Sequence, residues 1–172
     1  MLERLEAGAA PLTRWMAVAG LVCFVAVAMA TIVDVLLRWL LNSPIDGVEE
    51  VTRLAVAVAI ASFFPLALAE RHHIAITFLG SVLGARARAW LESFAALVTS
   101  WFFFVAGWQF VLYTEQVEEA GETTWILGWT VTPWWAAVTA FMLVCVPVQL
   151  LVALGEIARA ARGAARPAGG GG

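Results

Sequence analysis

The stretch "WMAVAGLVCFVAVAMATIV", Trp15 to Val33, contains no charged side chain. An α-helix needs about 20 apolar residues to cross the ~30 Å hydrocarbon core of a bilayer, and this stretch is close to that length. Lipid offers no hydrogen bonds to the backbone, so a helix is the conformation that satisfies such a segment on its own. The stretch therefore predicts a transmembrane helix, and it sets the fold class for the rest of the chain.

Three further stretches lack charge over a similar length. They run from Leu54 to Ala69, from Ser93 to Thr114 and within residues 123–155. Composition agrees, because 62% of the chain is hydrophobic and 13% is charged, whereas soluble proteins carry about 25% charged residues. We predict an all-α integral membrane protein that lies in the lipid bilayer and binds no nucleic acid. Residues 1–160 form one transmembrane domain, with helices at about 15–41, 47–70, 88–114 and 133–158, and a flexible Gly- and Ala-rich tail follows at 161–172.

A signal peptide is the alternative interpretation of the first segment. Arg4 and Arg14 precede it, and "AVAMA" at residues 26–30 offers small residues for cleavage. A signal peptide usually has an apolar run of about 7–15 residues, whereas this run is longer and continues past the cleavage candidate. We therefore predict an uncleaved membrane helix.

The helix ends carry recognisable signals. Residues 42–44, Asn-Ser-Pro, are expected to end the first helix. Asp46 is then predicted to be the N-cap of the second helix, with Glu49 completing a capping box three residues later. Thr132 is likewise a candidate N-cap, and Pro133 follows it at the first helical position, where proline is favoured. We therefore expect the fourth helix to begin at Pro133.

Arginine alone sets the expected orientation, because the chain has no lysine. Eight arginines fall in residues 1–14, 70–89 and 159–166, and the other two flank the first hairpin. The loop after the third helix has four glutamates between residues 115 and 122 and no basic residue. By the positive-inside rule, both termini face the cytoplasm and this loop faces the opposite side.

Two acid–base pairs flank the first hairpin. Asp34 and Arg38 are four residues apart, as are Glu49 and Arg53, and Glu50 lies beside the second pair. Residues at this spacing share a helix face and can form ion pairs. The pairs would either neutralise each other within the chain or act as an ionic latch or ion path toward a partner. None of these acids is expected at mid-bilayer, so we do not expect the chain to transport a substrate by itself.

The residue types that carry catalysis or bind cofactors are scarce. His72 and His73 are the only histidines, and adjacent helix positions point about 100° apart, so they cannot both face one metal or haem. They are typical of a solvated helix end. Cys23 and Cys145 lie in apolar runs, where buried thiols are usual. We find no nucleophile–base pair, phosphate loop or metal-spaced cluster, and we therefore predict neither an enzyme nor a cofactor.

The third helix shows two different faces. One is a bulky stripe and the other, about a quarter turn away, consists of small residues where another helix could approach closely. The bulky face is suited to packing, to lipid or to a larger membrane partner. The bulky stripe is Trp90, Phe94, Leu97, Trp101, Phe104 and Trp108, and the small stripe is Ser93, Ala96, Ser100 and Gly107.

The order of several short motifs adds a family resemblance. The motifs are Arg38, Asn42, Pro44, Glu49 and Glu50 around the first hairpin, His73 and Ile74 after the second helix, and Gly121 ahead of Pro133 and Trp134. From about Trp15 to Glu156 this order resembles the DctQ-like small membrane subunits of TRAP (tripartite ATP-independent periplasmic) transporters. The chain departs from the family pattern at Thr77, where an acidic residue is common, and at Val48, where an aromatic residue is common.

The resemblance implies a part in a secondary transporter. In such a system a periplasmic binding protein delivers an organic acid (a carboxylate), and a large membrane subunit carries it together with sodium. This chain would scaffold the large subunit in the bacterial inner membrane and hold no sodium itself. The alternatives are a stand-alone four-helix exporter and the membrane anchor of a respiratory complex. The residues expected to contact partners are Arg38, Glu49, Glu50, Arg53, His73, Pro133 and Trp134.

Overall fold

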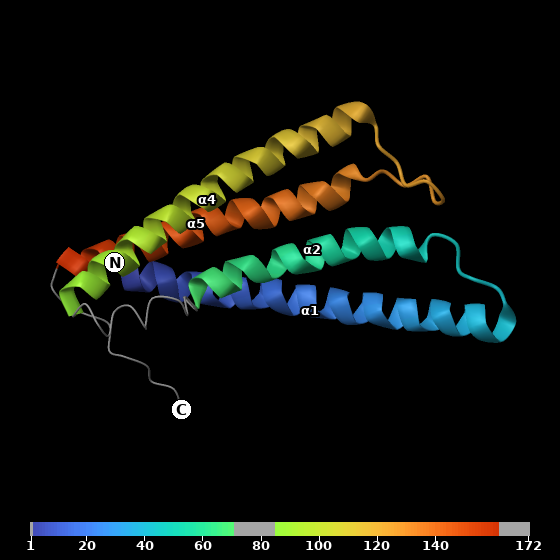
Figure 1. Ribbon diagram of the computed structural model, residues 1–172, viewed down its shortest axis with the longest axis horizontal. Helices are drawn as coiled ribbons and strands as arrows, with labels where there is room; N and C mark the ends of the chain where they lie inside the picture. Colours follow the sequence, from blue (N-terminus) through green and yellow to red (C-terminus); the bar gives the residue numbers. More distant parts are fainter. Residues whose placement is uncertain (1, 71–84, 162–172) are drawn as a thin grey trace.

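The computed structural model describes residues 2–70 and 85–161. Within these ranges the chain forms four α-helices, and each contains an apolar stretch long enough to cross a membrane (Figure 1). The all-α, four-helix prediction is confirmed. The helices are α1 (Leu2–Leu41), α2 (Val48–Ala69), α4 (Ala85–Ala120) and α5 (Thr132–Ala161).

The helices form two hairpins that meet along α2 and α5. α1 packs against α2 and α4 packs against α5, while α5 also contacts α2 and, more sparsely, α1. α5 is therefore the central helix, and α1 and α4 lie at the edges. Both hairpin loops lie at one end of the molecule, and the beginning of α1 and the end of α5 lie at the other (Figure 1).

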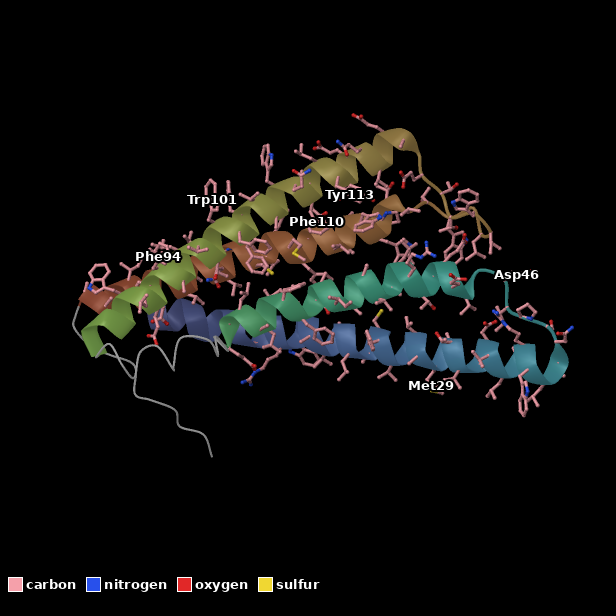
Figure 2. The ribbon with its side chains drawn as sticks, in the orientation of Figure 1. Met29, Asp46, Phe94, Trp101, Phe110 and Tyr113 are labelled. Atoms are coloured by element: carbon pink, nitrogen blue, oxygen red, sulfur yellow. The ribbon has the colours of Figure 1, made fainter. Side chains whose placement is uncertain are left out.

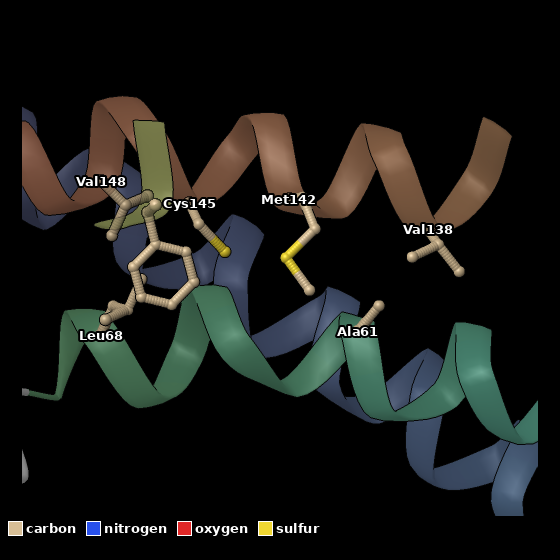
Figure 3. Packing of buried hydrophobic residues seen from close by; sticks show 7 residues of the cluster. Ala61, Leu68, Val138, Met142, Cys145 and Val148 are labelled. Atoms are coloured by element: carbon tan, nitrogen blue, oxygen red, sulfur yellow. The ribbon is translucent and has the colours of Figure 1, made fainter. Parts of the chain in front are cut away.

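The core lies between α2 and α5, with one large side chain from α4. Phe103 of α4 reaches it and contacts Phe64 of α2 edge-on, with ring centroids 6.0 Å apart. Between helices in lipid, close packing rather than hydrophobic burial supplies the attraction. Figure 3 shows how α2 and α5 contribute small and medium side chains to this contact. The buried cluster is Ala61, Leu68, Phe103, Val138, Met142, Cys145 and Val148.

The small face of α4 packs against α5, as its composition predicts. Ser93 and Ala96 are buried, and a Cβ placed on Gly107 would lie 3.5 Å from side-chain atoms of Leu143 and Val146. The bulky stripe, by contrast, is exposed along its whole length. Figure 2 shows two of its members, Phe94 and Trp101, on the outer side of α4.

Polar side chains join α4 to α5 at two levels. Gln149 is fully buried, and its Nε2 donates to the Ala96 carbonyl at 3.2 Å. Ser100 Oγ donates to the Gln149 carbonyl at 3.3 Å. Nearer the hairpin loop, the hydroxyls of Thr114 and Thr139 are hydrogen-bonded at 2.7 Å. Such bonds supply roughly 0.6–2 kcal/mol each between membrane helices.

α1 and α2 approach each other closely at Gly20. A Cβ on Gly20 would collide with Ser62 Oγ and lie 3.0 Å from the Ala59 carbonyl. Ser62 is held in place there because its hydroxyl donates to that same carbonyl at 2.7 Å. A larger residue at position 20 would force the Ser62 side chain to shift and would press against the Ala59 carbonyl, so a bulky side chain there would push the two helices apart.

The helix bounds correct three expectations. The helices α1 and α4 extend beyond their uncharged runs, to Leu2 and Ala120, because a helix can continue into water once the membrane segment has nucleated it. The predicted cap at Asp46 is wrong: Gly47 occupies the N-cap of α2 at φ 86°, and no side chain caps the helix. α5 begins at Thr132, one residue before the predicted start at Pro133.

Candidate functional site

The candidate site is the pair of hairpin loops at one end of the molecule. We name them the Ile45 loop, residues 42–47, and the Trp125 loop, residues 121–131. Each loop is fixed by a carboxylate that accepts hydrogen bonds from main-chain N–H groups. Hydrogen bonds to an ionised acceptor are roughly twice as strong as neutral ones, so these two carboxylates determine the shape of this end of the protein.

Asp34 fixes the Ile45 loop. It lies two turns before the end of α1 and is 6% exposed. Its Oδ1 accepts the Ile45 N–H at 2.7 Å, and its Oδ2 accepts Arg38 Nη2 at 2.9 Å. The Asp34 carboxylate therefore holds the Ile45 loop against the end of α1, and Arg38 neutralises the charge of this carboxylate.

Glu50 fixes the Trp125 loop, although it belongs to the other hairpin. In the first turn of α2, its Oε1 accepts the N–H of Trp125 at 2.7 Å and that of Ile126 at 3.0 Å. Its Oε2 accepts the N–H of Ile126 at 3.2 Å and that of Leu127 at 3.3 Å. One side chain thus satisfies three consecutive main-chain donors and ties the α4–α5 hairpin to the start of α2.

The Trp125 loop is also closed on itself. Thr124 and Trp129 are joined by two hydrogen bonds, from Thr124 N–H to the Trp129 carbonyl at 2.8 Å and from Trp129 N–H to Thr124 Oγ1 at 3.0 Å. At its base, Val131 N–H donates to the Glu122 carbonyl at 3.1 Å. The loop therefore has one defined shape, and the Glu50 carboxylate holds that shape against α2.

The two loops touch at Gly47. A Cβ on this residue would lie 2.5–2.8 Å from three side-chain carbons of Leu127. Gly47 also has φ 86°, a left-handed conformation that glycine adopts without steric cost. Glycine is therefore required here for two reasons: the backbone turn into α2 has a positive φ, and the Leu127 side chain occupies the space that a Cβ would need.

Several residues predicted to contact partners lie at this end. Both predicted ion pairs form: Arg38 with Asp34, and Arg53 Nη2 with Glu49 Oε1 at 3.4 Å. These contacts support the interpretation of mutual neutralisation within the chain. Pro133 and Trp134 lie in the first turn of α5, directly after the Trp125 loop. His73 lies outside the described residues. The contacts of all these residues with partners stay predictions.

Sequence reasoning missed the Trp125 loop as a site. Trp125 is 99% exposed and Ile126 62% exposed, although their main-chain N–H groups are held by Glu50. The available signal was a tryptophan in a short segment that begins with "GETT" and ends in "GWT". Such a segment is a turn by composition, and a large aromatic residue at its tip is unusual for a turn.

An apolar recess lies on α4 and α5 near the same end. Its lining is apolar and aromatic: Tyr113 meets Trp135 edge-on at 4.8 Å, and Phe110 stacks on Trp135 at 6.4 Å. It contains no charged residue. In the part of the chain that the structure describes, no group of three His, Cys, Asp or Glu residues could hold a metal ion. The recess encloses about 480 Å³ and is lined by Ala106, Gln109, Phe110, Tyr113 and Trp135.

Comparison with known proteins identifies the family. No curated protein and no solved structure matches the chain. A family model described as "Tripartite ATP-independent periplasmic transporters, DctQ component" matches residues 27–163, which is more than half of the chain. That family is a transporter component and not an enzyme family. The match favours the transporter subunit over the exporter and the respiratory anchor. The chain is a multi-pass membrane protein, and it belongs to the DctQ component family of the tripartite ATP-independent periplasmic transporters.

Proposed function

We propose that this chain is the scaffold of a TRAP transporter that takes up organic acids across the bacterial inner membrane. It holds a large carrier subunit in the bilayer, and that subunit binds the carboxylate substrate together with sodium. A periplasmic binding protein delivers the substrate. The observation that carries the proposal is the family match over residues 27–163.

The distribution of charge supports a scaffold rather than a carrier. In the described helices the charged residues lie outside the middle of each apolar span, and the innermost are Arg14 and Asp34 in α1, Arg53 in α2, Glu92 in α4 and Glu156 in α5. A protein that moves ions or carboxylates across the bilayer needs ionisable or polar groups near its midplane. The described helices carry no charged residue near their middles, and the polar groups there, such as Gln149 Nε2 and the Ser62 hydroxyl, donate to carbonyls of the chain itself. The transport chemistry is therefore assigned to the large subunit.

The exposed faces of the edge helices support an assembly in the membrane. α4 turns its small face to α5 and leaves its bulky stripe exposed, with Trp101 68% exposed. α1 is likewise exposed over most of its length. Each face offers a rigid, apolar surface that a larger membrane subunit can cover. The proposal places the large subunit on one of these two edges.

The orientation follows from the arginine distribution. Both termini face the cytoplasm, and the Ile45 and Trp125 loops face the periplasm. The two loops lie at one end in Figure 1, which is consistent with this topology. Cysteine scanning tests it: a single cysteine at Glu118 is expected to react with a membrane-impermeant reagent in intact cells. Labelling only after permeabilisation would contradict the topology.

Reconstitution tests the function. Proteoliposomes that contain this chain and the large subunit are expected to accumulate an organic anion when a sodium gradient and the binding protein are supplied. Vesicles with this chain alone are expected to accumulate none. Uptake by the isolated chain would contradict the scaffold proposal, and so would full activity of the large subunit without this chain.

A further inference from the structure

We infer that the Trp125 loop is a docking surface for the soluble binding protein, with the Trp125 side chain at its centre. The inference rests on the function proposed above and adds a specific surface to it. The partner it fits is a water-soluble protein with an apolar depression surrounded by basic side chains. Three observations carry the inference: the exposure of the loop tip, its fixed shape and the charges around it.

The tip exposes more apolar surface than a turn needs. Trp125 is 99% exposed and its neighbour Ile126 is 62% exposed. A tryptophan can bury roughly 150–250 Å² in a contact, and tryptophan is enriched among the few residues that dominate protein–protein affinity. The protein itself uses none of this area, because the Trp125 ring packs against nothing in the described chain.

The shape of the tip is fixed before any partner arrives. The Glu50 carboxylate occupies the N–H groups of Trp125, Ile126 and Leu127, and the Thr124–Trp129 bonds close the turn behind them. Ordering a loop upon binding opposes association, because each immobilised side chain loses conformational freedom. A loop that is already ordered avoids most of this cost, so the Trp125 loop is preorganised for binding.

The surroundings of the tip are acidic. The end of α4 leads into the loop with four exposed glutamates, none of which forms an ion pair within the described ranges. The loop itself, residues 121–131, has no arginine. Complementary charges accelerate encounter and set specificity, so the matching partner surface is basic. The glutamates are Glu115, Glu118, Glu119 and Glu122.

A lipid surface is the competing occupant for an exposed tryptophan. Tryptophans do gather at membrane interfaces, but a fluid interface requires no fixed loop geometry. Acidic side chains are also repelled by anionic lipid headgroups. The Glu50 contacts and the glutamates therefore favour a protein partner over lipid.

The decisive experiment titrates binding protein against the complete transporter in proteoliposomes. Trp125→Ala is expected to raise the binding-protein concentration for half-maximal uptake by about 30-fold, the effect of losing a residue worth about 2 kcal/mol. The rate at saturating binding protein and the co-purification with the large subunit are expected to stay unchanged. Trp39→Ala is the matched control, because Trp39 is an exposed tryptophan (79%) near the same end but on α1 rather than on the loop. In complexes that retain the large subunit, it is expected to leave the half-maximal binding-protein concentration unchanged.

The outcomes separate this inference from the function beneath it. If the wild-type complex transports and Trp125→Ala titrates as the wild type does, the docking surface is wrong and the scaffold function stands. If the wild-type complex does not transport, the proposed function fails and the inference falls with it. A stronger salt dependence of half-maximal uptake in the wild type than in Glu118→Gln/Glu119→Gln would support the basic partner surface.

A spin label tests the lipid alternative directly. A charged, water-soluble reagent places a nitroxide on Trp125→Cys in the assembled complex. The label is expected to be relaxed by a water-soluble agent and to become immobilised when binding protein is added at a concentration that saturates the variant. Relaxation by a lipid-soluble agent with no response to binding protein would show a membrane anchor and overturn the inference.

Discussion

The middles of the helices and the hairpin loops are held together by different kinds of contact. In the middles, small residues allow close approach: Gly20 faces Ser62, and Gly107 faces Leu143. At the loops, two carboxylates, Asp34 and Glu50, hold main-chain N–H groups. The difference indicates a division of roles, because packing sets the spacing of the helices while the carboxylates set the shape of the surface that the loops present.

The two carboxylates differ in what they join. Asp34 holds Ile45, which is 11 residues away on the same hairpin. Glu50 holds Trp125, which is 75 residues away on the other hairpin. Asp34 therefore stabilises a loop within its own hairpin, whereas Glu50 couples the two hairpins. Variants at the helix middles, at each carboxylate and at the exposed ion pair test whether packing and carboxylates have these separate roles.

The largest effect is expected at the close contact between α1 and α2. Gly20→Leu places a side chain where Ser62 Oγ already lies, and overpacking of this kind costs about 3 kcal/mol. Unfolding in detergent should show the loss of stability. The control is Ala26→Leu on the exposed side of α1, which should be close to neutral. Equal stability of the two variants would contradict the close α1–α2 contact.

A smaller loss is expected at Asp34. Asp34→Ala leaves the Ile45 N–H without its acceptor and Arg38 without its ion-pair partner, which costs about 2 kcal/mol of unfolding free energy. Asp34→Asn retains an oxygen that can accept from Ile45 and should lose less. If both substitutions were equally harmful, the charge rather than the hydrogen bond to the loop would be the important feature.

The smallest effect is expected at the second ion pair. The side chains of Arg53 and Glu49 are 78% and 88% exposed, and exposed pairs contribute little because water and salt screen them. Arg53→Ala should change stability by less than about 0.5 kcal/mol. Arg38→Ala should cost more, because it removes the partner of a buried carboxylate. A larger loss for Arg53→Ala than for Arg38→Ala would reverse this ranking.

The features that depend on local chemistry could be predicted from the sequence. The four helices follow from uncharged runs, because lipid forces such runs to satisfy their own backbone. The Asp34–Arg38 pair follows from the i,i+4 spacing. The small stripe on α4 predicted a close helix contact, and α5 makes that contact.

The features that depend on two distant segments could not be predicted. The bond between Glu50 and the Trp125 loop requires the two hairpins to be side by side, and nothing local to Glu50 specifies that. The collision site at Gly20 likewise depends on the register of α1 against α2. The predicted N-cap at Asp46 is wrong because the neighbouring Gly47 takes a left-handed conformation in contact with Leu127. This tertiary contact outweighs the preference of aspartate for the N-cap position.

Hydrogen exchange of the Trp125 loop tests most directly whether Glu50 couples the two hairpins. In lipid nanodiscs, Glu50→Gln is expected to make the N–H groups of residues 125–127 exchange about 10-fold faster, because a neutral amide replaces the acceptor that holds all three. Residues 42–47 should keep their protection, and Asp34→Ala should produce the opposite pattern, with faster exchange at Ile45 and no change at 125–127. Unchanged exchange at 125–127 in Glu50→Gln would contradict the coupling.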